Sequence, residues 1–157
     1  MNQVLVPLST WLHALATVVF IGHFVLLAVL YLPSLSAHGG ASVAGPVLSG
    51  VSKRSRPWLY ASLIVFMVTG IVLMIVDPNY QGVGNFGNFW AVMMLAKHIL
   101  IVVMIVLGFW YNAILRVGPM MNSNSPEITI ARFRNYVNAM AVCGVLVLLL
   151  TALSQAQ

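Results

Sequence analysis

Three histidines and one lysine lie inside long apolar stretches of this sequence, where ionisable side chains are rare. His13 and His23 belong to the first stretch, and the adjacent residues Lys97 and His98 belong to the third. A neutral imidazole in hydrocarbon still needs partners for its N–H group and its lone pair, and a lysine ammonium needs an anion. These four residues are therefore the first candidates for chemistry.

His13 and His98 are predicted to lie at matching depths in a membrane. His13 follows the outer end of its helix by about eight residues, counted from around Leu5, and His98 lies nine residues after Phe89. Both distances correspond to ~12–14 Å along a helix. Two imidazoles at one level on two helices are the arrangement with which a helix bundle clamps a cofactor. We therefore expect His13 and His98 to be the axial ligands of a b-type haem. The alternative is that each imidazole only forms a hydrogen bond to a neighbouring helix.

Three further residues are expected to line this haem site. Lys97 would compensate the negative charge of the haem propionates, because none of the apolar stretches contains a carboxylate. Trp11 and Trp90 lie near the outer ends of their stretches. They would either wall the cofactor or belong to an aromatic belt at the membrane interface.

His23 is a candidate for a second metal or cofactor site. It lies ten residues after His13 and therefore ~15 Å deeper along the helix. No second histidine is expected at its depth. The soft side chains that would either accompany it as ligands or simply fill apolar space are Met67, Met104 and Met140.

Copper is the alternative cofactor, because thioether and imidazole groups suit this metal. A transport path for copper needs ligands at several depths. The residues that would supply them are His13, His23, Met74, Met93, Met94 and His98. A third alternative is a purely structural membrane subunit without metal or chromophore.

The elements that must position these residues are four apolar helices. A helix needs roughly 20 apolar residues to cross a hydrocarbon core of ~30 Å, and the stretches at about 8–32, 58–76, 89–115 and 136–153 qualify. The chain has 157 residues, of which 61% are hydrophobic and 6% charged, and this excludes an ordinary soluble domain. One cysteine excludes an internal disulfide. We expect a single all-α, four-span integral membrane bundle in contact with the lipid bilayer.

The connections carry the signal for orientation. Residues 33–57 and 117–126 are predicted loops, residues 77–88 a turn-rich segment, and residues 127–135 a polar lead-in to the last helix. Every lysine and arginine outside the spans lies in residues 33–57 or 116–135: Lys53, Arg54, Arg56, Arg116, Arg132 and Arg134. The positive-inside rule then predicts that both these segments face the cytoplasm and both termini the outer side of an inner (cytoplasmic) membrane. The net charge of +5 is explained by this orientation, and not by nucleic-acid binding.

The order of motifs over about residues 8–120 resembles the copper-resistance-D-like family of membrane proteins. The first helix opens on Trp-Leu-His at 11–13 and ends on Pro33, as that family's first helix does. The second follows a basic segment and contains Thr69 and Gly70, and the third carries Lys97. The resemblance implies a four-helix haem or metal site.

The same pattern, a histidine in the first helix and a lysine in a later one, is similar to the membrane protoporphyrinogen oxidase that binds haem b. That resemblance implies that His13 and Lys97 form a functional pair. The oxidase has Pro-Arg-Leu after its first helix, whereas this chain has Pro-Ser-Leu at 33–35. We therefore expect a redox carrier that acts as a homodimer or as a subunit of a larger redox complex. A stand-alone oxidase is an alternative.

Overall fold

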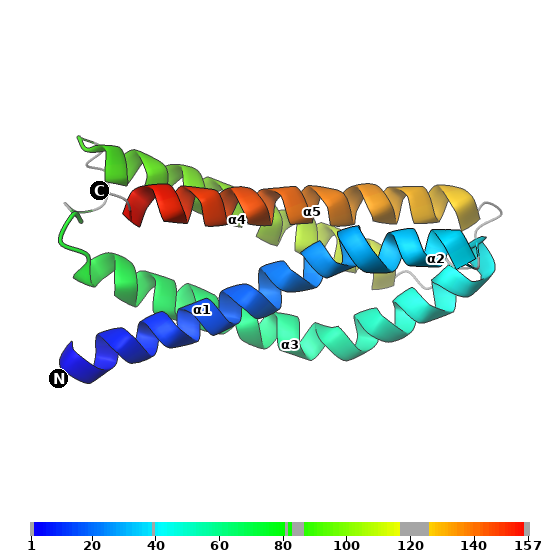
Figure 1. Cartoon of the computed structure of the whole chain (residues 1–157), viewed down its shortest axis with the longest axis horizontal. Coiled ribbons are helices and arrows are strands. Elements are labelled where there is room, and N and C mark those ends of the chain that lie inside the picture. Colours follow the sequence, from blue (N-terminus) through cyan, green and yellow to red (C-terminus); the bar gives the residue numbers. More distant parts are fainter. Residues whose placement is uncertain (1, 39, 81, 83–86, 117–125, 156–157) are drawn as a thin grey trace.

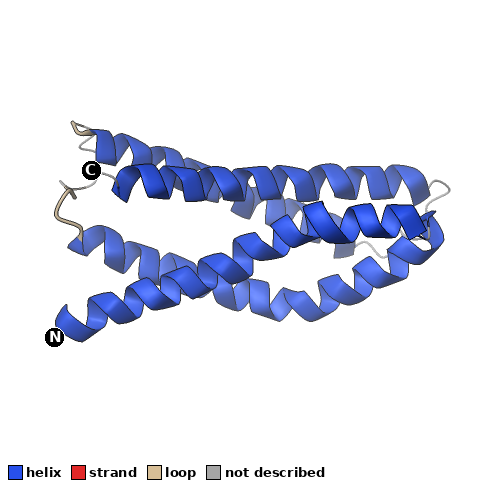
Figure 2. Ribbon diagram, viewed as in Figure 1, coloured by secondary structure: helices blue, strands red, loops and turns tan. Residues whose placement is uncertain are grey.

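The computed structural model of the chain describes residues 2–38, 40–80, 82, 87–116 and 126–155. This part of the chain consists of helices joined by turns and contains no strand (Figure 2). Its elements in chain order are α1 (Asn2–Leu26), a π-helical turn η1 (Leu27–Tyr31), α2 (Leu32–His38), α3 (Gly40–Val76), α4 (Phe89–Arg116) and α5 (Pro126–Gln155).

Four helical segments are long and apolar enough to cross a membrane, which confirms the predicted all-α, four-span fold. They are Val4–Ala37, Pro46–Val76, Phe89–Gly108 and Ala131–Gln155. Large apolar side chains are exposed on all four segments, among them Val18, Ile64, Val102 and Val142. Such surfaces suit contact with lipid tails and not with water.

The prediction of a loop over residues 33–57 was wrong. The first span continues through η1 and α2, and α3 begins at Gly40 and runs through Pro46 and Pro57. Proline lacks an N–H group and clashes with the carbonyl four residues earlier. Before Pro33 the wider η1 turn, with Leu32 N–H bonded to the Leu27 carbonyl, loosens the helix where that clash would arise.

The remaining connections follow the sequence more closely. Asp77–Tyr80 form a turn after α3, in which Tyr80 N–H donates to the Asp77 carbonyl at 3.0 Å. Residues 127–135 form the first part of α5, as expected for a lead-in to that helix. The predicted loop at 117–126 lies outside the described residues except for Pro126, which begins α5.

The helices pack unequally. α1 packs against α3 and α5, and α4 packs mainly against α5 (Figure 1). The core lies where α1, α4 and α5 meet, around Phe24, Met104 and Met140. A second cluster lies farther along, where Leu27, Leu48 and the fully buried Val137 meet.

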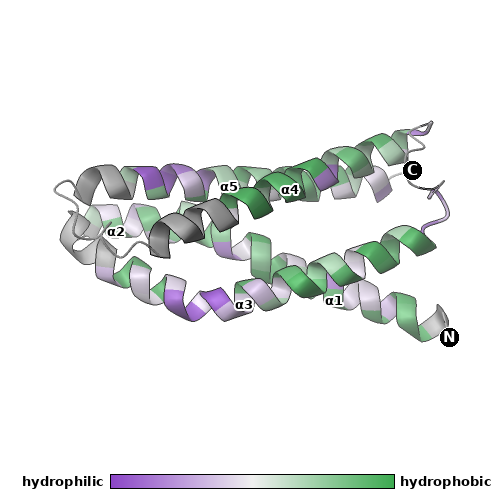
Figure 3. Cartoon of the chain, turned by 180° about the vertical axis from the view of Figure 1, so that it is seen from behind, coloured by the Kyte–Doolittle hydropathy of each residue, from purple (hydrophilic) through white to green (hydrophobic). Residues whose placement is uncertain are grey.

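The two ends of the bundle differ in charge. The start of α1 and the end of α5 lie at one end, here called the terminal end (Figure 1). The other end carries α2, the start of α3 and the start of α5, and is here called the basic end. Figure 3 shows hydrophilic stretches on α3 and α5 toward this end, where Lys53, Arg54, Arg132 and Arg134 lie.

Candidate functional site

A cavity lies inside the bundle on the side of the basic end. Its volume is about 120 Å³, and it rises to about 870 Å³ of empty space only when the open mouth and the adjoining solvent are counted. All four spans contribute to its wall, which is mainly apolar. Its lining residues are Phe20, His23, Phe24, Leu27, Leu48, Val51, Ser52, Ser55, Arg56, Leu59, Tyr60, Leu63, Met104, Ile105, Gly108, Phe133, Tyr136, Val137 and Met140.

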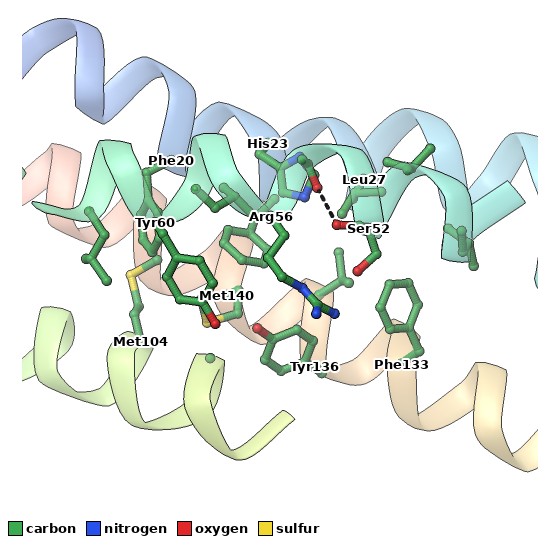
Figure 4. Close-up of a pocket in the computed structure, with 18 of the residues that line it drawn as sticks. Phe20, His23, Leu27, Ser52, Arg56, Tyr60, Met104, Phe133, Tyr136 and Met140 are labelled. Atoms are coloured by element: carbon green, nitrogen blue, oxygen red, sulfur yellow. Dashed lines mark hydrogen bonds between the residues drawn. The ribbon is translucent and has the colours of Figure 1, made fainter. Parts of the chain in front are cut away.

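The α3 wall of the cavity is one stripe of the helix. Its lining positions recur every three or four residues, which is the spacing of one helical face, from Leu48 to Leu63. Arg56 lies in the middle of this stripe and points from α3 into the cavity, toward the wall that Phe133 and Tyr136 of α5 form (Figure 4). The arginine therefore turns away from the surface and into the bundle.

His23 brings an imidazole to the same cavity. Its ring lies edge-on to Phe24, with centroids 5.3 Å apart, and Phe24 in turn lies edge-on to Tyr136 at 6.1 Å. Met104 of α4 and Met140 of α5 lie on the cavity wall as well. Two of the three methionines considered as soft partners of His23 thus share its cavity. The third, Met67, is exposed on α3.

His13 ties α1 to α3 in the half of the bundle near the terminal end. Its Nδ1 lies 2.9 Å from the Thr69 hydroxyl, and its ring stacks on Phe66 with centroids 4.4 Å apart. Gly70 permits this approach, because a Cβ at that position would lie 3.3 Å from the His13 Cε1 atom. The glycine that follows Thr69 therefore allows the imidazole to pack closely on α3.

The hydrogen bonds of Thr69 define which nitrogen of His13 carries the proton. The Thr69 hydroxyl donates its one proton to the Val65 carbonyl at 2.6 Å, so its oxygen accepts from His13. Nδ1 of His13 is then the N–H donor, and Nε2 keeps the lone pair. This is the arrangement in which a second group orients a metal-binding histidine.

Of the adjacent residues Lys97 and His98, the lysine faces the bundle. The Asp77 carboxylate attracts its ammonium, and the charge of the ammonium acts on His13. His13 and Lys97, the pair that the family resemblance implies, are therefore within electrostatic range of each other. Asp77, which directly follows α3, supplies the negative charge that no span contains.

His98 has a different environment from His13. Its side chain is exposed, and its Nδ1 donates to the carbonyl of Met94 on the same helix at 2.7 Å. α1 and α4 share no extensive contact, because α1 packs mainly on α3 and α4 packs mainly on α5. A cofactor held by both His13 and His98 would need the His98 ring to leave this outward face.

The two tryptophans also differ. Trp11 is 61% exposed on α1, which suits a residue of an interfacial belt. Trp90 is 6% exposed and packs edge-on against Tyr80 of the preceding turn, with centroids 6.4 Å apart. Trp90 therefore packs the turn that follows α3 against the start of α4.

Arg56, Tyr60 and Tyr136 were not predicted as site residues. Arg56 was expected in the loop over residues 33–57. A signal in the sequence could have found Arg56 and Tyr60. If the predicted helix had been extended toward the N-terminus through Pro57, helical spacing would have placed on one face Ser52, Ser55, Arg56 and Tyr60.

No protein-family model, curated protein or solved structure matches the chain.

Proposed function

We propose that this protein is a small multi-pass membrane haem protein that carries electrons, with a b-type haem in the cavity and His23 as a ligand from α1. The cavity supports this proposal best, because it joins an imidazole, two thioethers and a guanidinium within an apolar wall. A bound haem would supply one-electron chemistry at its iron. The chain's own contribution would be to hold the group, exclude water and set a low dielectric around it.

The proposed ligands differ from the pair expected from spacing alone. His23 replaces His13 as the ligand from α1, because His23 lines the cavity and His13 does not. A methionine replaces His98, which lies on the outer face of α4. Met104 and Met140 are the candidates for the second ligand, since both lie on the wall of the same cavity. Histidine with methionine is an established ligand combination for haem iron.

A copper-handling protein is the second candidate function. His23, Met104 and Met140 offer the nitrogen and sulfur ligands that suit copper, and they share one cavity. Arg56 favours haem over copper, since a guanidinium in an apolar cavity repels a bare cation and attracts a cofactor with carboxylates. Arg56 is thus the feature that separates the two proposals.

We also propose that the basic end faces the cytoplasm and both termini face the outer side of the inner membrane. Lys53, Arg54, Arg132 and Arg134 all lie toward this end, which the positive-inside rule assigns to the cytoplasm. An electron carrier of this size needs a redox partner, such as a larger membrane complex or a second copy. The exposed face of α4, which carries His98, is the surface we propose for that contact.

The test is an absorbance spectrum of the purified protein, oxidised and then reduced with dithionite, with metal analysis of the same sample. We expect a Soret band that shifts on reduction and iron near one per chain. Copper near one per chain without a Soret band would favour the second candidate. A sample with neither would overturn both and leave a structural subunit.

The ligand assignment has its own pair of variants. We expect His23→Ala to lose most of the Soret absorbance, because the imidazole that faces the cavity is removed. His98→Ala is the matched control and should keep the haem, since that ring lies on the outer face of α4. If His98→Ala lost the haem and His23→Ala kept it, the cavity would not be the haem site.

A further inference from the structure

Arg56 brings a positive charge into a cavity that contains no negative one. The residues that line the cavity include no aspartate or glutamate. At a rise of ~1.5 Å per residue, Asp77 lies about 30 Å farther along α3 than Arg56. The side chain of the other acidic residue, Glu127, lies outside the described residues. Within the described part of the chain, the guanidinium therefore has no carboxylate to balance it.

The guanidinium is also open to a ligand. No hydrogen bond or ion pair of the Arg56 side chain occurs among the described residues, and no buried side-chain nitrogen or oxygen in that part lacks a partner. Its N–H groups are thus exposed to the cavity space, where Figure 4 shows the side chain pointing. A guanidinium with free N–H groups of this kind can bind an anion that enters the cavity.

The rest of the wall indicates what kind of anion fits. Ser52, Ser55 and Tyr60 add hydroxyl groups on the α3 side, near the guanidinium. Phe20 and Phe24 of α1 provide an apolar surface on the other side. The cavity therefore combines a guanidinium and hydroxyl groups with a mainly apolar and aromatic lining. It suits a ligand with a large apolar body and a carboxylate at its edge.

We infer that Arg56 is the carboxylate anchor of the cavity and selects ligands by their free acid groups. This inference rests on the proposed function, in which the ligand is haem b and the carboxylates are its propionates. A guanidinium binds a carboxylate through two parallel N–H bonds, which lysine does not reproduce. Arg56 thus fixes the orientation of the ligand, while His23 binds its metal.

The test compares haem b with its dimethyl ester, in which both carboxylates are esterified. Both are titrated into haem-free protein in detergent, and binding is followed at the Soret band. We expect the wild-type protein to bind the free acid about 10- to 100-fold more tightly, the effect of one hydrogen-bonded charge pair. Arg56→Gln should lose this preference by weakening the free acid alone. Arg56→Lys should keep part of it.

Arg54→Gln is the matched control, because it removes the same charge from an exposed position two residues away on the same helix. It should leave the preference unchanged. A carboxylate or phosphate of a lipid is the other source of such an anion. A medium-chain fatty acid and an anionic phospholipid are therefore added as competitors, and neither should displace the haem from the wild-type protein.

Each outcome bears on a different claim. Equal binding of acid and ester by the wild-type protein would overturn the anchoring role and leave the haem proposal standing. This comparison needs no variant, so it decides the matter even if Arg56→Gln fails to fold. Displacement of haem by the fatty acid or the phospholipid would overturn its selectivity for haem carboxylates. Binding of neither form of haem would instead overturn the proposed function.

Discussion

At the residue scale, most polar side chains inside the spans are satisfied by the backbone of their own helix. Thr17 donates to the His13 carbonyl at 2.7 Å, and Thr151 donates to the Val147 carbonyl at 2.8 Å. The bond between His13 and Thr69 differs because it joins two helices. In lipid, where apolar contact does not drive helices together, such a bond contributes to association.

Thr69→Val tests this bond. Valine has a similar volume but no hydroxyl, so the His13 N–H loses the Thr69 oxygen as an acceptor while the packing is kept. We expect the free energy of unfolding to fall by about 1 kcal/mol, within the range known for hydrogen bonds between membrane helices. The measurement is equilibrium unfolding in mixed micelles with increasing SDS.

Thr151→Val is the control for Thr69→Val, because it removes a hydroxyl that bonds only within α5. Its effect should stay below about 0.5 kcal/mol. Equal losses in the two variants would show that the interhelical bond contributes nothing specific.

At the element scale, the contact between α1 and α5 depends on a small residue. A Cβ at Gly144 would lie 2.8 Å from the Ile21 Cγ2 atom, closer than real side chains approach. Ile21 is 5% exposed and belongs to the main core cluster, so it has little room to move. Small residues with this role are common where membrane helices meet.

Gly144→Ala is expected to destabilise the bundle. The added methyl group overpacks the α1–α5 contact, which typically costs about 1–3 kcal/mol. Gly22→Ala is the control on α1, because nothing lies within 4 Å of a Cβ at that position. Unfolding in the same micelles should separate the two variants. A stable Gly144→Ala protein would mean that the two helices sit farther apart.

The extent of the helices could be predicted only in part. The apolar run of α4 predicted a helix over 89–115, close to the observed Phe89–Arg116. The start of α3 was missed, since glycine and proline between 39 and 57 are turn formers in water. In an apolar bundle, the cost of leaving backbone groups unpaired favours a continuous helix even through Pro46 and Pro57.

At the scale of the whole molecule, charge and cavity are placed toward the same end. The exposed cations lie toward the basic end, and the cavity lies in the half of the bundle next to it. The other half contains His13, Lys97 and Asp77, whose charges act on one another. The molecule therefore has two polar regions at different depths, and the apolar core around Phe24 and Met140 forms part of the wall of one of them.

Labelling in intact cells tests the orientation proposed above. In a Cys143→Ser background, a cysteine is placed at Asn79 near the terminal end or at Ala37 near the basic end, both exposed positions. We expect a membrane-impermeant maleimide to label Asn79→Cys in intact cells. Ala37→Cys should react only after permeabilisation. The reverse pattern would show that the basic end faces outward.

The sequence by itself determined that the chain is an all-α, four-span membrane protein, because the length and polarity of a span are local properties. It also singled out His13, His23 and Lys97. Only the tertiary structure decided that Lys97 faces the bundle while His98 faces outward, and that His23 and Arg56 share a cavity. The physical reason is that helices apolar on every side carry no pattern that marks their inner face. Their rotation, and with it each side chain's neighbours, is set by packing against the other helices.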